Sequence, residues 1–148
     1  FKNERLRNRL CTHKSIAESL HEMLIVQTNK NYVRPHMYVK KSKSIHIIEG
    51  QLDVILFDNN GKIIDVVRMG DYASKKVFYF RIDNSQYHSL EVDSEIAVFH
   101  ESTDGPFDPT DTLYASWAPD ENDVEPVEKY IQILKSEKNK YFNIQQSK

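Results

Sequence analysis

The chain has 148 residues, of which 39% are hydrophobic and 28% charged, and these values predict one globular domain with a core of its own. The formal net charge of -2 argues against nucleic acid or an anionic membrane surface as a partner, and the single cysteine, Cys11, excludes an internal disulfide. No signal-peptide pattern and no long apolar run is present, so we expect a cytoplasmic protein without a membrane span.

Residues 1–21 are basic and polar at their start, and we predict an N-terminal segment that precedes the main domain. The stretch 15–24 has Ile16, Leu20 and Leu24 at helical spacing, whereas "EMLIVQT" (22–28) is equally typical of a strand. The pattern leaves both interpretations open at this boundary.

Residues 22–118 are dominated by β signals. "SIHIIEGQLDVILF" (44–57) is rich in β-branched residues and is broken by Gly50, and "DNNG" (58–61) predicts a hairpin turn because Gly61 tolerates a positive φ. Further strands are predicted over 62–69, 75–82, 87–92 and 95–101. Short strands with close turns predict an all-β fold, an antiparallel sandwich or barrel.

Residues 119–148 change in character. "VEPVEKYIQILK" (124–135) places Val127, Tyr130, Ile131 and Leu134 on one helical face and predicts a short C-terminal helix. The polar stretch from residue 136 to the end is predicted to be a loose tail.

The stretch "VRPHMYVKKSKSIHIIEGQLDV" (33–54) raises the question of a metal site. His36 and Tyr38 are two residues apart, so in a strand their side chains lie on one face, which is how a β-scaffold presents two ligands. Tyr38 is a poor ligand unless its phenol is deprotonated, and the ammonium of Lys43 has no lone pair. Because a single histidine on a strand is more often structural, the local spacing alone does not predict a metal.

The chain as a whole resembles the WbuC-type cupin family from about Arg5 to Lys135. The segments that carry the resemblance are "RLRNRLCTH", "YVRPH", "EGQLDVILFDNNGKI", "YHSL", "FHESTDGPFDP" and "YASWAPDEND". The pairing of "GPFDP" with "WAP" shortly after it is the most specific of these signals. The resemblance implies a small antiparallel cupin (jelly-roll) barrel over 22–118, followed by the helix and tail.

Cupins have a metal centre built from two motifs, the first similar to G-x5-H-x-H-x3,4-E-x6-G. Aligned back from Gly50, this motif places His36 at the first histidine, Tyr38 at the second and Lys43 at the glutamate. The second motif is similar to P-x-G-x-x-H and here is "DNSQYH", which keeps His88. The metal motif is therefore degenerate: His36 and His88 could hold zinc, nickel or iron weakly, or no metal binds at all.

Lys43 would repel a metal ion by several kcal/mol at about 4 Å. We therefore hypothesise that Lys43 stands in for the metal and offers a fixed charge to an anionic group of a ligand. The alternative is that its flexible stem carries the ammonium out to water.

Other residues are candidates for ligand contacts. Arg34 could bind an anionic substrate or pair with an acidic neighbour, Glu101 could orient His88 or contact the substrate, and Trp117 could stack on a sugar ring or pack across one barrel end. Arg9 and His13 match the family's N-terminal pattern, with no role assigned to them.

Side chains of a strand alternate between its two faces, so His46, three positions after Lys43, is expected to point to the opposite face. His100 is a weaker candidate for a replacement metal ligand.

Proteins similar to this one are found with genes for bacterial surface polysaccharides, O-antigen and capsule. The resemblance implies a small-molecule ligand, a sugar or sugar nucleotide. One hypothesis is an enzyme that isomerises or epimerises it, with His36, Tyr38, Lys43 and His88 as acid and base groups. The other is a non-catalytic binding module that has lost its metal. A homodimer is also compatible with the pairing of sheet edges.

Overall fold

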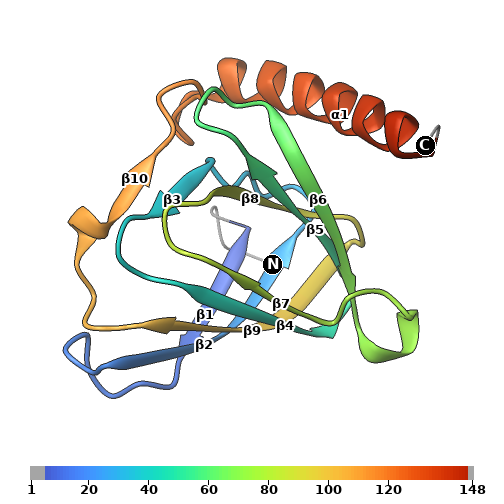
Figure 1. Ribbon diagram of the computed structural model, residues 1–148. Coiled ribbons are helices and arrows are strands. Elements are labelled where there is room, and N and C mark those ends of the chain that lie inside the picture. The colour runs from blue at the N-terminus through green and yellow to red at the C-terminus, as the bar shows by residue number, and fades with distance from the viewer. Residues whose placement is uncertain (1–5, 147–148) are drawn as a thin grey trace.

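The computed structural model describes residues 6–146, which form two five-stranded antiparallel sheets, two short 3-10 helices and one α-helix (Figure 1). Arg5, where the resemblance begins, and the last two residues of the predicted tail lie outside this range. The predicted all-β barrel with a C-terminal helix is confirmed.

The first sheet forms one wall of the barrel. In spatial order it contains β1 (Arg7–Cys11), β2 (Leu20–Thr28), β9 (Ile96–Asp104), β4 (Lys43–Glu49) and β7 (Tyr79–Ile82). The predicted strand over 75–82 is shorter than expected, because residues 72–74 form a 3-10 helix and Lys75 follows with a left-handed φ of 60°. The choice left open for 22–28 is resolved as strand.

The second sheet forms the opposite wall. In spatial order it contains β10 (Thr112–Tyr114), β3 (His36–Tyr38), β8 (Tyr87–Val92), β5 (Gln51–Phe57) and β6 (Ile63–Gly70). The predicted hairpin between β5 and β6 is confirmed, and Gly61 has the positive φ, 86°, that its turn requires. The polar turn and the flanking β-branched runs are local signals, which is why this hairpin could be predicted.

Strand β1 lies within the residues that the sequence assigned to an N-terminal segment. It pairs with β2 over its whole length, with Arg7 opposite Gln27 and Cys11 opposite Met23. Because directly opposed residues share a face, the side chains of Arg7, Arg9 and Cys11 lie on the same side of the sheet as the inward residues of β2. The domain boundaries at residues 21 and 118 stay predictions, but this strand belongs to the first sheet.

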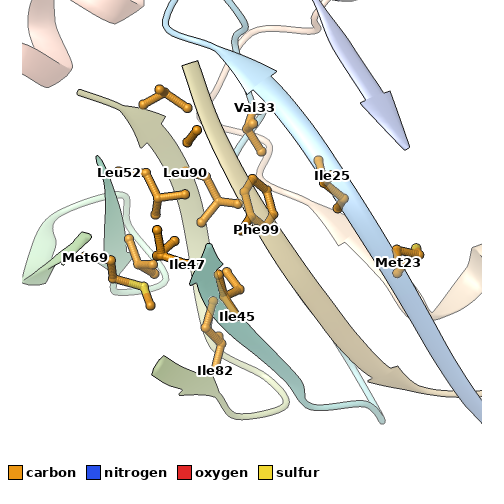
Figure 2. Packing of buried hydrophobic residues seen from close by; sticks show 13 residues of the cluster. Met23, Ile25, Val33, Ile45, Ile47, Leu52, Met69, Ile82, Leu90 and Phe99 are labelled. Atoms are coloured by element: carbon orange, nitrogen blue, oxygen red, sulfur yellow. The ribbon is translucent and has the colours of Figure 1, made fainter. Parts of the chain in front are cut away.

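The main core lies between the two sheets (Figure 2). Ile25, Ile45 and Phe99 project from the first sheet toward Leu52 and Leu90 of the second, and all five are buried. The alternation of buried and exposed residues along β2 and β9 follows from the two-residue period of a strand with one face in the core.

A second core lies between the outer face of the second sheet and helix α1 (Val124–Gln146). Leu134 is the buried helical residue of this core, and Val127 is the other buried residue of the helix. Figure 1 shows the helix running across this sheet. The prediction of a loose tail from residue 136 is wrong as far as residue 146, because Tyr141 and Phe142 continue the apolar face. Within the described residues, no helix is long and apolar enough to cross a membrane.

Candidate functional site

Two histidines from neighbouring strands meet at one polar end of the barrel interior. His36 of β3 is directly opposite His88 of β8, and their ring centroids are 4.5 Å apart. Tyr38, two residues after His36, lies on the same face with ring centroids 5.6 Å from His36 and 6.2 Å from His88. The structure therefore brings these three predicted site residues together.

A buried ion pair reaches the same region from the first sheet. The Nζ atom of Lys43 lies 3.3 Å from a carboxylate oxygen of Glu101, and the two side chains are only 4% and 6% exposed. Lys43 Nζ also lies 5.4 Å from the centre of the Tyr38 ring. Lys43 thus points into the barrel rather than to water, and its partner is the predicted Glu101.

Backbone hydrogen bonds determine the tautomers of both imidazoles. His36 Nδ1 lies 2.8 Å from the carbonyl oxygen of Arg34, and His88 Nδ1 lies 3.0 Å from that of Gln86. A carbonyl only accepts, so in each neutral ring Nδ1 carries the proton and Nε2 carries a lone pair. His88 Nε2 is buried and has no hydrogen-bond partner within residues 6–146.

The charges in this region follow from burial and from Lys43. Burial first, and Lys43 second, lower the pKa of His36 to about 4 and the pKa of His88 well below its usual value. Lys43 lowers the pKa of Tyr38, but burial and Glu101 raise it and the net direction is upward. Near neutral pH both imidazoles and the phenol are therefore uncharged.

Glu101 behaves differently from the other buried groups. Burial raises its pKa, but Lys43 and then Arg9 lower it, and the net pKa of Glu101 lies below its usual value. The carboxylate therefore stays ionised beside the Lys43 ammonium. The site combines one ion pair with two neutral imidazoles, whose Nε2 atoms are acceptors.

Two adjoining cavities give access to all of these groups except His88. The inner one has a volume of about 50 Å³ and is lined by His36, Tyr38, Lys43 and Glu101. The outer one has a volume of about 250 Å³ and shares Arg9, Tyr38 and Glu101 with the inner one. The closed barrel therefore provides a cavity shared by His36, Tyr38 and Lys43. His88 lines neither cavity, although its ring centroid lies 4.5 Å from that of His36.

Sequence reasoning missed two polar residues of the inner cavity, Arg7 and Gln27. The spacing of Arg7 and Arg9 was visible as a basic residue at every second position. This spacing places both side chains on one face only if the segment is a strand, and the polar sequence "RNRLC" does not predict a strand. Arg9 and Cys11 also line the outer cavity, together with His13.

Arg34 and Trp117 lie elsewhere and line neither cavity. Arg34 Nη1 donates to Asp120 at 2.8 Å, and its guanidinium lies 5.2 Å from the centre of the Tyr114 ring. Trp117 packs in the second core, with its ring centroid 5.1 Å from that of Phe57. In this structure both residues join segments of the fold, and their ligand-binding role stays a prediction.

The histidines at positions 46 and 100 lie on the outer face of the first sheet. They are directly opposite one another in the β4–β9 pairing, and His100 Nε2 lies 3.5 Å from Glu22. This agrees with the alternation that turns His46 away from Lys43.

The turn before β8 keeps the backbone conformation expected of the second motif. Ser85, at the position of the motif glycine, has a left-handed φ of 60°, a conformation that glycine adopts most easily. Its amide donates to the Tyr38 carbonyl at 2.6 Å, so the turn joins the two motifs.

The residues present do not fit a metal centre of the usual three or four ligands. Among the described residues, no group of three or more histidine, cysteine, aspartate or glutamate side chains could hold an ion. Lys43, whose side chain is buried, stands at the position of the motif glutamate. Its ammonium pairs with the Glu101 carboxylate, so this position carries a positive charge instead of a metal ligand. Weak binding of zinc, nickel or iron by His36 and His88 stays a prediction.

Comparisons with known proteins bear on the fold of the chain. Residues 1–69 match the family model of a domain of unknown function, DUF6016. No curated protein sequence matches the chain.

Among solved structures, the chain is similar to the capsular polysaccharide assembling protein CapF of Staphylococcus aureus, with a TM-score of 0.59 and 14% identity over 76% of this chain and 30% of that one. It is also similar to Streptomyces PAC13, solved with uridine, with a TM-score of 0.55 and 12% identity over 76% of this chain and 79% of that one. The cupin domain of Schizosaccharomyces pombe Cnp3 matches with a TM-score of 0.52 and 14% identity over 68% of this chain and 66% of that one.

These similarities and the two facing sheets define the chain as a small cupin β-barrel. It spans less than a third of CapF, and at these identities the likeness concerns the fold alone.

Proposed function

We propose that this cupin binds a sugar or sugar nucleotide at the polar end of its barrel and isomerises or epimerises it. The observation that carries the proposal is the buried Lys43–Glu101 pair beside two neutral imidazoles whose Nε2 atoms carry the lone pair. In this arrangement the ammonium of Lys43 is the fixed positive charge at the position where the metal motif has a ligand.

The cavity sizes indicate how a ligand would bind. The inner cavity of about 50 Å³ has room for a few water molecules or for one polar group of a ligand. The outer cavity of about 250 Å³ is large enough for a sugar ring. The ring would lie in the outer cavity, with one of its oxygen substituents reaching Lys43.

Isomerisation moves a proton on the carbon next to a carbonyl. A C–H bond breaks, an imidazole Nε2 accepts the proton, and the electron pair moves onto the carbonyl oxygen, where Lys43 and the Tyr38 hydroxyl stabilise it. Protonation of the same carbon from its other face by a second acid group completes an epimerisation. Protonation of the former carbonyl carbon, with transfer of the neighbouring hydroxyl proton to the new hydroxyl oxygen, completes an isomerisation, and neither reaction changes the overall oxidation state.

The low basicity of the imidazoles sets a condition on this chemistry. With a pKa of about 4, His36 is protonated at pH 7 only at a cost of about 4 kcal/mol in the free protein. The negative charge that develops on the substrate beside the imidazolium reduces this cost.

The same property favours a second candidate, a non-catalytic binding module. Poor bases still accept hydrogen bonds from ligand hydroxyls, so His36 and His88 could serve recognition alone. The degenerate metal motif agrees with this alternative.

We place either activity in the assembly of bacterial surface polysaccharides, O-antigen or capsule. The support is the WbuC-type resemblance together with the similarity to CapF, whose name describes capsular polysaccharide assembly. The similarity to PAC13, solved with uridine, supports a nucleotide-linked sugar as the ligand.

Thermal shift with UDP-N-acetylglucosamine, dTDP-glucose and their 4-keto-6-deoxy derivatives, with and without zinc, nickel or iron, identifies a ligand. Only the keto sugars have the carbonyl that the proposed proton transfer requires. Proton NMR of the bound sugar in D2O then measures exchange of a ring C–H with solvent. We expect His36→Gln to slow this exchange by about 100-fold, the usual contribution of a general base. The matched control is His100→Gln on the outer face of the first sheet, which should exchange at the wild-type rate.

Each outcome decides between the candidates. Stabilisation by a nucleotide sugar without C–H exchange or turnover identifies the binding module. No stabilisation by any member of the panel would contradict both candidates, and exchange that continues unchanged in His36→Gln would exclude this imidazole as the base.

A further inference from the structure

The inner cavity is lined by more positive than negative side chains. Arg7, Arg9 and Lys43 are the cations, and Glu101 is the one carboxylate among the described residues that line it. His36 adds no charge near neutral pH, because burial and Lys43 lower its pKa to about 4. Arg9 and Lys43 alone exceed the Glu101 carboxylate by one positive charge, and such an excess in a partly enclosed space attracts an anionic group.

Gln27 adds an unused hydrogen-bond donor to this lining. Its side chain projects from β2 and is 1% exposed, and the residue borders the inner cavity. Its Nε2 is buried and donates to no atom in the part of the chain that the structure describes. Buried amide donors are rarely left without an acceptor in folded proteins, so an oxygen atom from outside the chain is the expected partner.

The balance of donors and acceptors favours an anion over a neutral hydroxyl. Lys43, the Gln27 amide and the Tyr38 hydroxyl are donors. The acceptors are His36 Nε2 and the Glu101 carboxylate, which Lys43 already engages at 3.3 Å. A carboxylate or phosphate group offers only acceptors and carries the compensating charge. A water molecule could accept from Gln27, but it would leave the excess positive charge unbalanced.

We propose that the inner cavity is an anion subsite, in which Gln27 and Lys43 bind the carboxylate of an acidic sugar or the phosphoryl group of a sugar phosphate. The inference rests on the proposed function only in placing the sugar ring in the outer cavity. It narrows the ligand from sugars in general to sugars that carry an anionic oxygen group. It also assigns Gln27 as a residue that determines specificity.

Calorimetric titration with matched probes tests the subsite. Glucuronate and glucose differ by a carboxylate, glucose 6-phosphate and glucose differ by a phosphoryl group, and inorganic phosphate carries the anion without a sugar. We expect at least one of the two anionic sugars to bind about 10-fold or more tightly than glucose, a ratio that falls as salt is added. Whichever of glucuronate and glucose 6-phosphate binds more tightly shows whether the subsite prefers a carboxylate or a phosphoryl group.

The variant Gln27→Met removes the donor and keeps the side-chain volume. We expect it to weaken binding of the preferred anionic sugar about 5- to 10-fold, to leave glucose binding unchanged, and not to lower the melting temperature, since the lost group makes no internal hydrogen bond. Gln132→Met on the exposed face of α1 is the matched control and should change neither measurement.

The outcomes separate this inference from the proposed function. Equal affinity for glucose and both anionic sugars, or no binding of any anionic probe, overturns the anion subsite and leaves the proposed function to the nucleotide-sugar panel. An anion preference that persists in Gln27→Met overturns the role of Gln27. An anion preference without C–H exchange supports the subsite and contradicts the isomerase.

Discussion

The two imidazoles of the site are oriented by their own backbone. Each ring donates from Nδ1 to the carbonyl two residues earlier, His36 to Arg34 and His88 to Gln86. This local bond aims Nε2 into the interior whatever occupies the cavity. Burial of the rings disfavours their charged forms. The residues that could serve catalysis therefore also make the folded state sensitive to acid.

Acid should destabilise the fold through these histidines. Because the pKa of His36 falls from 6.5 when unfolded to about 4 when folded, the unfolded chain binds more protons between these values, and stability is lost as pH falls through this window. For His36 the loss is about 3 kcal/mol when complete. The lowered pKa values of His88 and Glu101 act in the same direction.

Urea denaturation at pH 7.5, 6, 5 and 4.5 measures this loss, and His36→Gln should show a visibly shallower pH dependence than the wild type. An unchanged dependence in the variant would show that His36 does not carry the shift.

At the scale of elements, helix α1 is held by charges as well as by apolar packing. Lys138 Nζ lies 2.8 Å from a carboxylate oxygen of Asp53 and also contacts Glu91, and its side chain is 13% exposed. The Tyr141 hydroxyl donates to Asp65 at 2.8 Å. The residues that make these bonds lie in the stretch that was predicted to be a loose tail. That stretch is polar, and its acidic partners on the second sheet are distant in the sequence, so the sequence alone did not predict an ordered helix there.

Removing the central charge of this helix should be costly. Lys138→Met leaves the largely buried Asp53 carboxylate without its partner, and we expect a loss of about 2–3 kcal/mol in the free energy of unfolding. Lys140→Met is the matched control, because Lys140 pairs with Glu137 at 65% and 52% exposure and should matter by less than about 0.5 kcal/mol. Equal losses in the two variants, measured by urea denaturation, would contradict the role given to Lys138.

At the scale of the whole molecule, the second sheet belongs to both cores. Its inward residues face the first sheet and its outward residues face α1, so Val54 and Ile55 are consecutive on β5 but lie in different cores. Shared strands of this kind couple the two layers. The predicted homodimer stays a prediction; the strands at the sheet edges are β1, β7, β10 and β6.

The single tryptophan, Trp117, lies in the second core and reports on it. We expect its fluorescence and the far-UV circular dichroism to change at the same urea concentration, as in a two-state transition of one small domain. The apo protein at neutral pH is the relevant sample. A fluorescence change at clearly lower urea would show that α1 detaches before the barrel unfolds.

Part of the site could be read from the chain and part could not. His36, Tyr38, Lys43 and His88 were expected at one site because the resemblance aligned them with two motifs, and the structure does bring them together. Gln27 and Arg7 were not expected, because no motif includes them. Their place in the cavity depends on the pairing of β1 with β2, a contact between chain segments with no local signal.

The sequence by itself determined the elements with local patterns: the β5–β6 hairpin, the alternating strands and the apolar face that begins α1. Turn-forming residues and side-chain periodicity act over a few residues, so they can be recognised in the sequence before the fold is known. Only the tertiary structure decided that Lys43 is paired with Glu101, that β1 contributes to the cavity, and that the last helical turns bind the second sheet. These depend on strand register and on desolvation by distant segments, which set the charge and hydrogen bonding of a side chain only once the barrel has closed.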